Sequence, residues 1–377
     1  MKVGILGGGQ LALMLAEAGA KQGLEVSALT SSKNDPVSFS SAKIIEGDLK
    51  DTECVEAFAN QVELLTWESE FIPVEKWPFL KGKFLPAIET ASFLRNKRSQ
   101  KETAKSLGIP TADFAIAPEG KEKLQQWVEG LSSKWGNVVL KWGELGYDGK
   151  GVCVAKGWDE TTKKFCDEGS SLYAEKKIDF DRELALVGAR STKGEVTFFP
   201  AVESIQKNNI CHHVLGPAMK LGLSAALETL MQDSARSLAT ETGYVGTFAT
   251  EWFQKGEVVY LNEIAPRVHN SGHITQLAFP ESQFDLHWRA LKGEKLQKPV
   301  AKSLYAMWNL LGVNSLKAPI PLPQVPKGAR LQWYGKSPIK AGRKMGHVNG
   351  VAADEGALRN LVKELEAMEN EWHRSLA

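Results

Sequence analysis

Residues 247–273 read TFATEWFQKGEVVYLNEIAPRVHNSGH, two apolar runs joined by a polar turn and followed by charged and amide side chains. The two runs predict a β-hairpin whose neighbouring strands carry Glu251 and Glu263. A plain four-residue loop would separate these carboxylates, whereas a bulge or an odd loop would place both on one face. Because acidic groups in apolar strands need a cation, the hairpin predicts either a metal site or a salt bridge to Arg267.

The segment after the second run combines a guanidinium, two imidazoles and an amide. Arg267 supplies a permanent cation, and His269 and Asn270 supply neutral donors and acceptors. Guanidinium forks suit carboxylates and phosphates, and carboxylate oxygens suit Mg²⁺. The segment therefore predicts a site that holds a metal and an oxyanion together, with a solvated loop as the alternative. For His273 we expect a structural hydrogen bond.

Composition places the chain among globular proteins. Its 377 residues are 43% hydrophobic and 24% charged, which suits two or three domains. A formal net charge of +1 leaves no global field for nucleic acid or an anionic membrane, so neither is an expected partner. The chain has neither a bilayer-length apolar run nor an apolar signal segment at its start, and its four cysteines show no CxxC spacing. We therefore expect a cytoplasmic protein with reduced thiols.

The first 95 residues alternate strand and helix patterns. A short aliphatic run leads into the glycine turn 7–9 and then a helical pattern, which predicts a doubly wound parallel-sheet domain. Such a turn also opens dinucleotide sites, but one match is weak evidence, and the second strand runs into Thr30 and Ser31 rather than an acidic residue. A nicotinamide oxidoreductase is thus the last alternative. Glu68 and Glu70 follow a strand, where they would meet a ligand or cap a helix.

Residues 96–174 predict a small domain with a mobile glycine loop. A helix rich in Lys and Arg spans 96–107, and the strand 137–141 precedes the loop GELGYDGKG at 143–151. Four glycines in nine positions allow the backbone to approach a ligand closely, although a hairpin turn would look similar. Lys141 ends a strand that reads as buried, and an isolated lysine there needs an anion.

Residues 175–377 predict an α+β domain with a small terminal sheet subdomain from about residue 300. Strands at 172–175, 184–190 and 196–200 follow one another closely, which implies an antiparallel sheet. Glu175 and Glu183 could serve one ligand or lie as solvated carboxylates at strand ends.

Taken together, the motifs resemble the ATP-grasp ligases and, within them, the 5-(carboxyamino)imidazole ribonucleotide synthases of purine biosynthesis. The segments that carry the resemblance are GGGQL (7–11), TWESE (66–70), NKRSQK (96–101), GYDGKG (146–151), FDREL (180–184), NEIAPRVHNSGH (262–273) and GRKMGH (342–347). It implies an α/β ATP-grasp fold and an ATP-dependent carbon–nitrogen ligase that uses Mg²⁺. The implied reaction carboxylates aminoimidazole ribonucleotide with bicarbonate, through carboxyphosphate, in a homodimer whose other partners are small molecules.

The resemblance also implies a role for each matching position. Nucleotide binding falls to Lys97, Lys141, Glu175, Lys176, Ile178, Glu183 and Asn262. The metal ligands are Glu251 and Glu263. The groups around bicarbonate and its phosphorylated form are Arg267, His269, Asn270 and Asp148. The ribonucleotide is expected to contact Gln10, Tyr147, Asp148, Lys150, Arg343 and Lys344.

Several positions depart from the family pattern. In the loop, Gly143 replaces an arginine and Leu145 a glycine, and further on Gln206 replaces a histidine and Asn209 a glycine. These changes leave the metal carboxylates untouched but alter the loop and the acceptor region. The sequence therefore leaves two alternatives open: an ATP-grasp ligase for another substrate, such as the formate-using glycinamide ribonucleotide enzyme, and a nucleotide-binding subunit without turnover.

Overall fold

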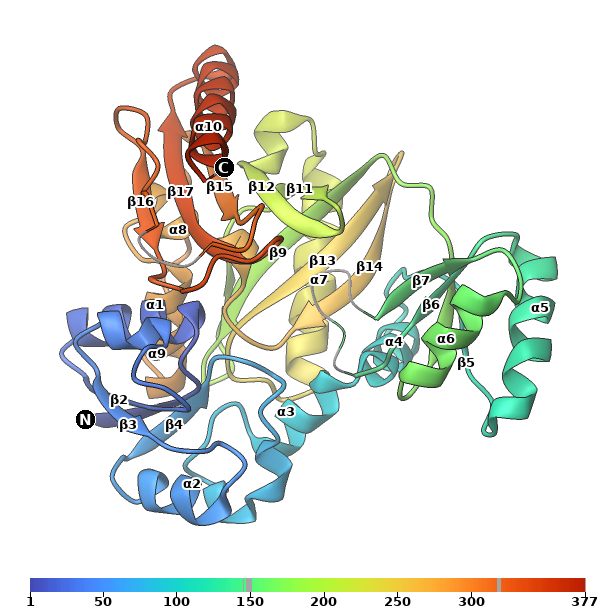
Figure 1. Ribbon diagram of the computed structural model, residues 1–377, viewed down its shortest axis with the longest axis horizontal. Coiled ribbons are helices and arrows are strands. Elements are labelled where there is room, and N and C mark those ends of the chain that lie inside the picture. The colour runs from blue at the N-terminus through green and yellow to red at the C-terminus, as the bar shows by residue number, and fades with distance from the viewer. Residues whose placement is uncertain (145, 147–150, 317–319, 377) are drawn as a thin grey trace.

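The computed structural model describes residues 1–144, 146, 151–316 and 320–376. Three sheets organise these residues: a parallel sheet near the N-terminus, a small antiparallel sheet, and a large antiparallel sheet that includes the C-terminal strands. Figure 1 shows the small sheet projecting at the right, the N-terminal sheet at the lower left, and the large sheet between and above them. The predicted mixture of a parallel N-terminal sheet with antiparallel sheets in the rest of the chain is confirmed.

The N-terminal sheet has the strand order β3-β2-β1-β4 and is covered on both faces. Val3 and Ile5 pack with α1, whereas Leu6 and Leu65 pack with α2, as a doubly wound sheet requires. Its elements are β1 (Lys2–Leu6), α1 (Gln10–Lys21), β2 (Glu25–Thr30), η1 (Pro36–Phe39), β3 (Lys43–Glu46), α2 (Thr52–Ala59), β4 (Leu64–Trp67), η2 (Val74–Lys76) and η3 (Pro78–Leu80).

The small sheet has the order β5-β8-β6-β7, and its own apolar core includes residues of α5 and α6. Helix α4 contacts α3 and the edge strand β14 of the large sheet. Because the chain continues from α4 into β5, this helix links the small sheet to the large sheet. The elements of this region are α3 (Ile88–Arg95), α4 (Lys97–Ser106), β5 (Phe114–Ile116), η4 (Lys121–Lys123), α5 (Leu124–Trp135), β6 (Val138–Lys141), β7 (Val152–Ala155), α6 (Glu160–Glu168) and β8 (Tyr173–Lys176).

The large sheet runs β14-β13-β9-β11-β12-β15-β17-β16, with β10 beside β9. Its first part contains β9 (Arg182–Arg190), β10 (Val196–Phe198), β11 (Val202–Lys207), β12 (Ile210–Gly216), η5 (Ala218–Leu221), α7 (Ala225–Glu241), β13 (Gly246–Lys255) and β14 (Val258–Ala265). Its second part contains η6 (Asn270–Gly272), α8 (Thr275–Ala278), α9 (Gln283–Lys292), β15 (Leu304–Leu311), β16 (Arg330–Trp333), β17 (Lys344–Ala352) and α10 (Glu355–Ser375).

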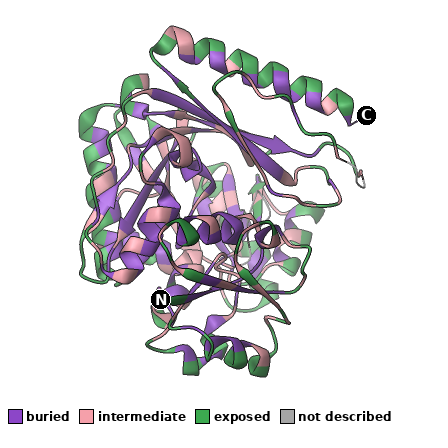
Figure 2. Ribbon diagram, turned by 90° about the vertical axis from the view of Figure 1, so that its left-hand side faces the viewer, coloured by how far each residue is buried: buried purple, intermediate pink, exposed green. Residues whose placement is uncertain are grey.

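Helices cover both faces of the C-terminal strands, which explains why every residue of β15 is buried. Ala306 and Trp308 pack with the terminal helix α10, whereas Tyr305 and Met307 pack with α9. Figure 2 shows α10 with an exposed outer face above strands that are largely buried. None of the helices in the described ranges is long and apolar enough to cross a membrane.

Two expectations about the sheets need correction. The strand at 172–175 does not join the two strands that follow it, because β8 pairs with β5 and β6 in the small sheet. The strands after residue 300 continue the large sheet, since β12 pairs with β15. The domain limits of 95, 174 and about 300 stay predictions. The limit at 174 falls inside β8, and we propose that the small domain ends after this strand.

Candidate active site

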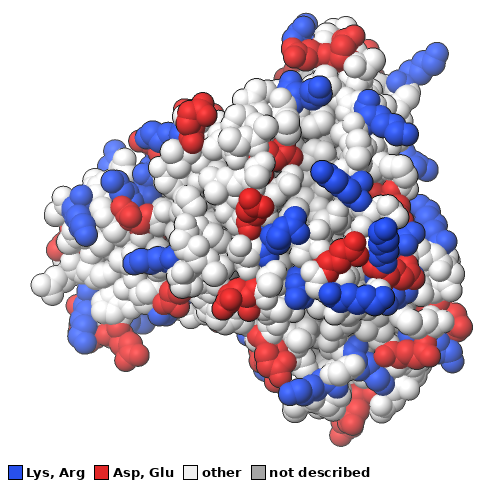
Figure 3. Space-filling view, turned by 180° about the vertical axis from the view of Figure 1, so that it is seen from behind, with Lys and Arg blue, Asp and Glu red and all other residues white. Residues whose placement is uncertain are grey.

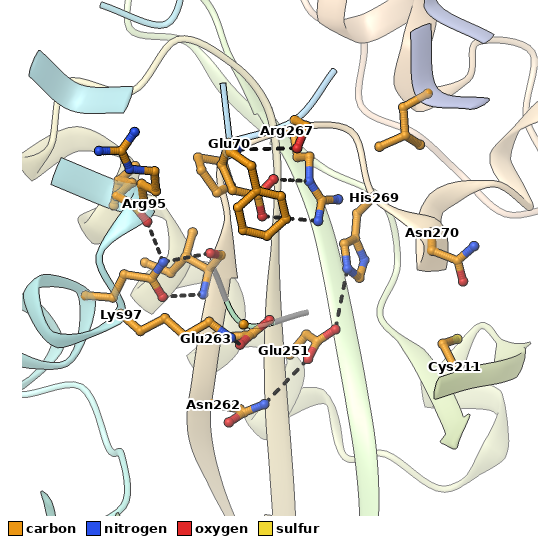
Figure 4. A pocket seen from close by; sticks show the side chains of 18 of the residues that line it. Glu70, Arg95, Lys97, Cys211, Glu251, Asn262, Glu263, Arg267, His269 and Asn270 are labelled. Carbon is orange, nitrogen blue, oxygen red and sulfur yellow. Dashed lines mark hydrogen bonds and ion pairs between the residues drawn. The ribbon is translucent and has the colours of Figure 1, made fainter. Parts of the chain in front are cut away.

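A cavity of about 430 Å³ lies where the N-terminal region meets the region of the large sheet. Its walls come from the glycine turn before α1, the segment after β4, the α3–α4 junction, the hairpin β13–β14 and the segment 266–273. Figure 4 shows the polar side chains of these segments around the cavity. The polar side chains that line the cavity, including some from β9, the β11–β12 hairpin and β17, are Gln10, Glu68, Ser69, Glu70, Arg95, Lys97, Gln100, Glu183, Gln206, Asn209, Glu251, Asn262, Glu263, Arg267, His269, Asn270, His273 and Lys344.

A β-bulge decides the geometry of the two hairpin carboxylates. Glu251 pairs with Glu263 and Trp252 with Leu261, so Asn262 is an extra residue that has no opposite partner. Without this bulge Glu263 would lie opposite Thr250. Residues directly opposite in an antiparallel pair share a face, and both carboxylates line the cavity. Of the arrangements that the sequence left open, the structure has the bulged hairpin.

The two carboxylates have different electrostatic surroundings. Burial and the adjacent charge of Glu263 raise the pKa of Glu251. Burial also opposes ionisation of Glu263, but the ammonium of Lys97 in direct contact outweighs it and lowers that pKa. The pKa of Lys97 is raised, since the carboxylates overcome the effect of its burial. The pair thus carries more negative charge than Lys97 alone offsets, and it attracts a further cation.

The pair suits Mg²⁺ better than a cation that needs a complete protein cage. Within the described ranges no cluster of three or more His, Cys, Asp or Glu side chains is arranged to hold a metal. Magnesium commonly takes one or two carboxylates and completes its shell with water and substrate phosphates. Glu251 and Glu263 fit that pattern, and Asn262 Nδ2 donates to Glu251 Oε2 over 3.5 Å.

The alternative of a salt bridge from the hairpin to Arg267 is not what the structure shows. The Arg267 guanidinium donates through Nε and Nη2 to the two oxygens of Glu70. His269 instead approaches the hairpin, with Nε2 3.4 Å from Glu251 Oε1. Glu70 comes from the segment after β4, where a carboxylate at a strand end was a weak signal for a ligand site.

The glycine turn before α1 is occupied by a side chain of the same protein. Glu68 accepts hydrogen bonds from the backbone N–H of Gly9 (2.6 Å) and of Ala12 (3.1 Å). A Cβ on Gly9 would lie 2.6 Å from the Glu68 carboxylate, so a larger residue there would displace that side chain from the turn. These N–H groups are therefore not open to a dinucleotide pyrophosphate, which argues against the nicotinamide alternative.

Residues behind the cavity fix the segment 266–273. Gln283 accepts from the backbone N–H of His269 (2.8 Å) and donates to its carbonyl (2.7 Å). Asn270 and the fully buried Asn309 exchange two amide hydrogen bonds of 3.0 and 2.7 Å. His273 Nδ1 lies 3.1 Å from Gln283 Nε2, and burial holds the pKa of His273 well below its usual range. This is the structural hydrogen bond expected for His273.

The anion near Lys141 is Glu175. Its two oxygens contact Lys101 (2.9 Å) and Lys141 (2.8 Å), and all three side chains are buried. Glu183, the other carboxylate expected near the nucleotide, lines the cavity, and burial raises its pKa. Sequence reasoning missed Lys101, because a lysine in a highly charged helix looks like a solvent-facing residue.

Of the remaining predicted residues, Lys176, Ile178 and Arg343 do not line the cavity. Lys176 is exposed and Ile178 half-buried between β8 and β9. Lys344 lines the cavity, whereas Arg343 Nη1 donates to the Pro338 carbonyl (2.8 Å). Tyr147, Asp148 and Lys150 lie outside the described residues.

The departure at Asn209 has a local explanation. Asn208 and Asn209 adopt φ values of +54° and +60° in the turn between β11 and β12. Asparagine tolerates this left-handed conformation better than most residues. The turn is therefore compatible with asparagine where the family pattern has glycine.

Comparison with known proteins adds an independent finding. Three family models match: the ribonucleotide synthetase preATP-grasp domain over residues 1–94, the ATP-grasp domain over 102–284, and the phosphoribosylaminoimidazole carboxylase C-terminal domain over 306–361. The N5-carboxyaminoimidazole ribonucleotide synthase of Pseudomonas aeruginosa is 35% identical over 98% of this chain and 99% of its own length.

Solved structures agree over the whole chain. The N5-carboxyaminoimidazole ribonucleotide synthetase of Thermus thermophilus has a TM-score of 0.85 at 32% identity, covering 97% of this chain and 98% of that one. The Aspergillus clavatus synthase in complex with ADP and 5-aminoimidazole ribonucleotide has a TM-score of 0.84 at 27% identity, covering 98% of each chain.

The carboxylate pair predicts a titration that can be measured without Mg²⁺. Replacing Glu263 with Gln should lower the pKa of Glu251 from about 7 toward its ordinary value, because a like charge disappears. Carboxyl-carbon NMR shifts against pH would measure this. Glu257→Gln, at the exposed tip of the same hairpin, should leave the titration unchanged. An equally high Glu251 pKa in Glu263→Gln would show that the two groups are not coupled.

Proposed function

Because the chain belongs to the N5-carboxyaminoimidazole ribonucleotide synthases, a family of ATP-grasp enzymes, we propose that it catalyses the ATP-dependent carboxylation of 5-aminoimidazole ribonucleotide. The proposed products are the carboxyamino ribonucleotide, ADP and phosphate. The observation that carries this proposal is the pair Glu251 and Glu263. The β-bulge places them opposite each other in the cavity, with Lys97 beside Glu263.

The residues of the cavity suit activation of bicarbonate. Bicarbonate is a poor electrophile until it is phosphorylated, and phosphoryl transfer depends mainly on alignment and on neutralising charge. We propose that Glu251 and Glu263 hold Mg²⁺, which when bound would neutralise phosphate charge. Lys97 then exchanges its contact with Glu263 for a phosphate. Asn262 and Lys141 are proposed to contact the nucleotide from the neighbouring wall.

The nucleotide base is assigned to the connection between the small and large sheets. Glu175 is buried and keeps Lys101 as its partner, so we propose that adenine is held by the backbone of Lys176 and Ile178 rather than by this carboxylate. Glu183 lines the cavity further along β9, and we propose that it accepts hydrogen bonds from the ribose hydroxyls.

We assign the bicarbonate subsite to Arg267, His269 and Asn270. Glu70 holds the Arg267 guanidinium in one orientation, and Asn309 does the same for the Asn270 amide. Donors that are fixed in advance stabilise an oxyanion without reorganising during the reaction. His269 is held at its backbone by Gln283, with its ring between Ser271 and Glu251.

The acceptor ribonucleotide is assigned to the side of the cavity nearest the N-terminal sheet and β17. Gln10 and Lys344 line this side, and Arg343 lies next to Lys344 in the sequence. Tyr147, Asp148 and Lys150 are proposed to join them on the grounds of the family motif alone. The likeness to an enzyme solved with ADP and 5-aminoimidazole ribonucleotide supports this acceptor.

We further propose a cytoplasmic homodimer that acts on small molecules, and sedimentation equilibrium would measure its mass. Figure 3 shows acidic and basic side chains interspersed over the face opposite to that of Figure 1, in line with the net charge of +1. Such a face offers no single-sign field for a polyanion.

Replacing Glu263 with Gln should lower the rate of ADP release by about 100-fold or more, because it removes charge from a metal position without changing volume. The assay measures ADP in the presence of bicarbonate and the imidazole ribonucleotide. Glu257→Gln is the matched control, and circular dichroism checks folding. Turnover in Glu263→Gln at the wild-type rate would reject the metal assignment.

Arg343→Ala should raise the KM for the ribonucleotide by about 10-fold with a smaller change in kcat, because a charge-assisted phosphate contact is lost. Lys340→Ala, three residues earlier and exposed, should behave as the wild type. If both variants show the same KM, Arg343 does not contact the ribonucleotide phosphate.

A further inference from the structure

A buried carboxylate with two lysine partners lies behind the nucleotide wall of the cavity. Glu175 on β8 is 3% exposed, and its partners Lys101 on α4 and Lys141 on β6 are 2% and 7% exposed. Lys101 Nζ lies 2.9 Å from Glu175 Oε1, and Lys141 Nζ lies 2.8 Å from Oε2. One carboxylate therefore has two cations, whereas one would be enough to neutralise it.

The two lysines differ in what else they bind. Lys101 donates to Thr111 Oγ1 (2.7 Å) and to the Leu261 carbonyl (2.9 Å) in addition to its contact with Glu175. The two hydrogen bonds anchor its ammonium beside the Glu175 carboxylate, with which it forms an ion pair. Thr111 and Leu261 are themselves bridged, so Lys101 is held by the body of the large sheet. Lys101 is a fixed partner of Glu175.

Lys141 does not itself line the cavity but contacts a residue that does. Its second partner is Asn262 Oδ1 at 2.9 Å, and Asn262 lines the cavity. The charge of Lys141 also favours ionisation of Glu183 and Glu263, two carboxylates of the same cavity. Of the two cations, Lys141 is the one that a phosphate in the cavity would attract.

A buried carboxylate that loses its partner is strongly destabilised. If Lys141 were the sole cation beside Glu175, its movement toward a phosphate would leave that charge unpaired. Burial lowers the pKa of Lys101 to about 8 against the pull of Glu175, so the amine is still mostly protonated at pH 7. Lys101 can therefore keep Glu175 neutralised while Lys141 binds elsewhere.

We propose that Lys101 is a positioning residue for nucleotide phosphates, acting as the permanent counter-ion of Glu175 so that Lys141 can exchange this ion pair for a phosphate. The inference rests on the proposed ATP site. It requires only nucleotide binding, not carboxylation.

The test measures binding of Mg·ADP and of adenosine by calorimetry or competition. Lys101→Met should weaken Mg·ADP by about 10-fold to 100-fold, because Lys141 must then stay with Glu175. Adenosine has no phosphate, so its affinity should not change. The double variant Lys101→Met with Glu175→Gln should recover Mg·ADP affinity, since an uncharged glutamine needs no cation. Lys105→Met, an exposed lysine on the same helix, is the control.

Three results would overturn the proposal: wild-type Mg·ADP affinity in Lys101→Met, an equal loss of adenosine binding in that variant, or no recovery in the double variant. If Lys101→Met fails to fold, Glu175→Gln alone decides the matter. It releases Lys141 and should bind Mg·ADP at least as tightly as the wild type, and weaker binding would contradict the proposal. Failure of the proposed reaction would be seen separately, as wild-type protein that binds Mg·ADP but releases no ADP with bicarbonate and the ribonucleotide.

Discussion

The repulsion between Glu251 and Glu263 is the constraint on which the rest of the site depends. Two carboxylates opposite each other in a hairpin would destabilise the strands unless cations came to them. Lys97 supplies a cation from α4, and the imidazole of His269, from the segment after β14, lies beside Glu251 as a polar partner. Each approach requires that its own element be held, by the packing of α4 against β14 and by Gln283 behind His269. The hairpin therefore organises its neighbours through charge as well as through hydrogen bonding.

A second set of polar contacts, with residues from all three sheet regions, holds the side chains of the site in place. The segment after β4 supplies Glu70 to Arg267, β15 supplies Asn309 to Asn270, and β8 supplies Glu175 to Lys141. Each supporting residue is far from its partner in the sequence and at least half-buried. The N-terminal region thus orients Arg267 in the segment after β14, β15 orients Asn270, and the small sheet orients a lysine of its own strand β6. The cavity lining draws mainly on the N-terminal and large-sheet regions, and Val152 of β7 joins it from the small sheet.

Much of this arrangement could be predicted from the sequence, and the failures have physical causes. Periodicity and glycine punctuation predicted the parallel sheet and the hairpin, and the motifs pointed to residues that line the cavity. The bulge at Asn262 could not be predicted, because strand parity depends on a single extra residue whose backbone leaves no composition signal. The partnership of Arg267 with Glu70 joins residues 197 positions apart, which local patterns do not encode. The burial of Lys101 was also missed. It arises because β14 packs against α4, a helix whose charged sequence resembles that of a fully solvent-exposed helix.

The carboxylate of Glu68 at the start of α1 has a consequence for how this kind of domain changes its use. A glycine turn at a helix start attracts any anion, and here the chain supplies one of its own. The Glu68 carboxylate thereby satisfies N–H groups at the positive end of the helix. It also joins the turn after β1 to the segment after β4. A single acidic side chain can thus occupy the anion-binding N–H groups of such a turn while the backbone keeps its conformation. The same turn then forms one wall of a cavity, most of whose other residues come from a neighbouring domain.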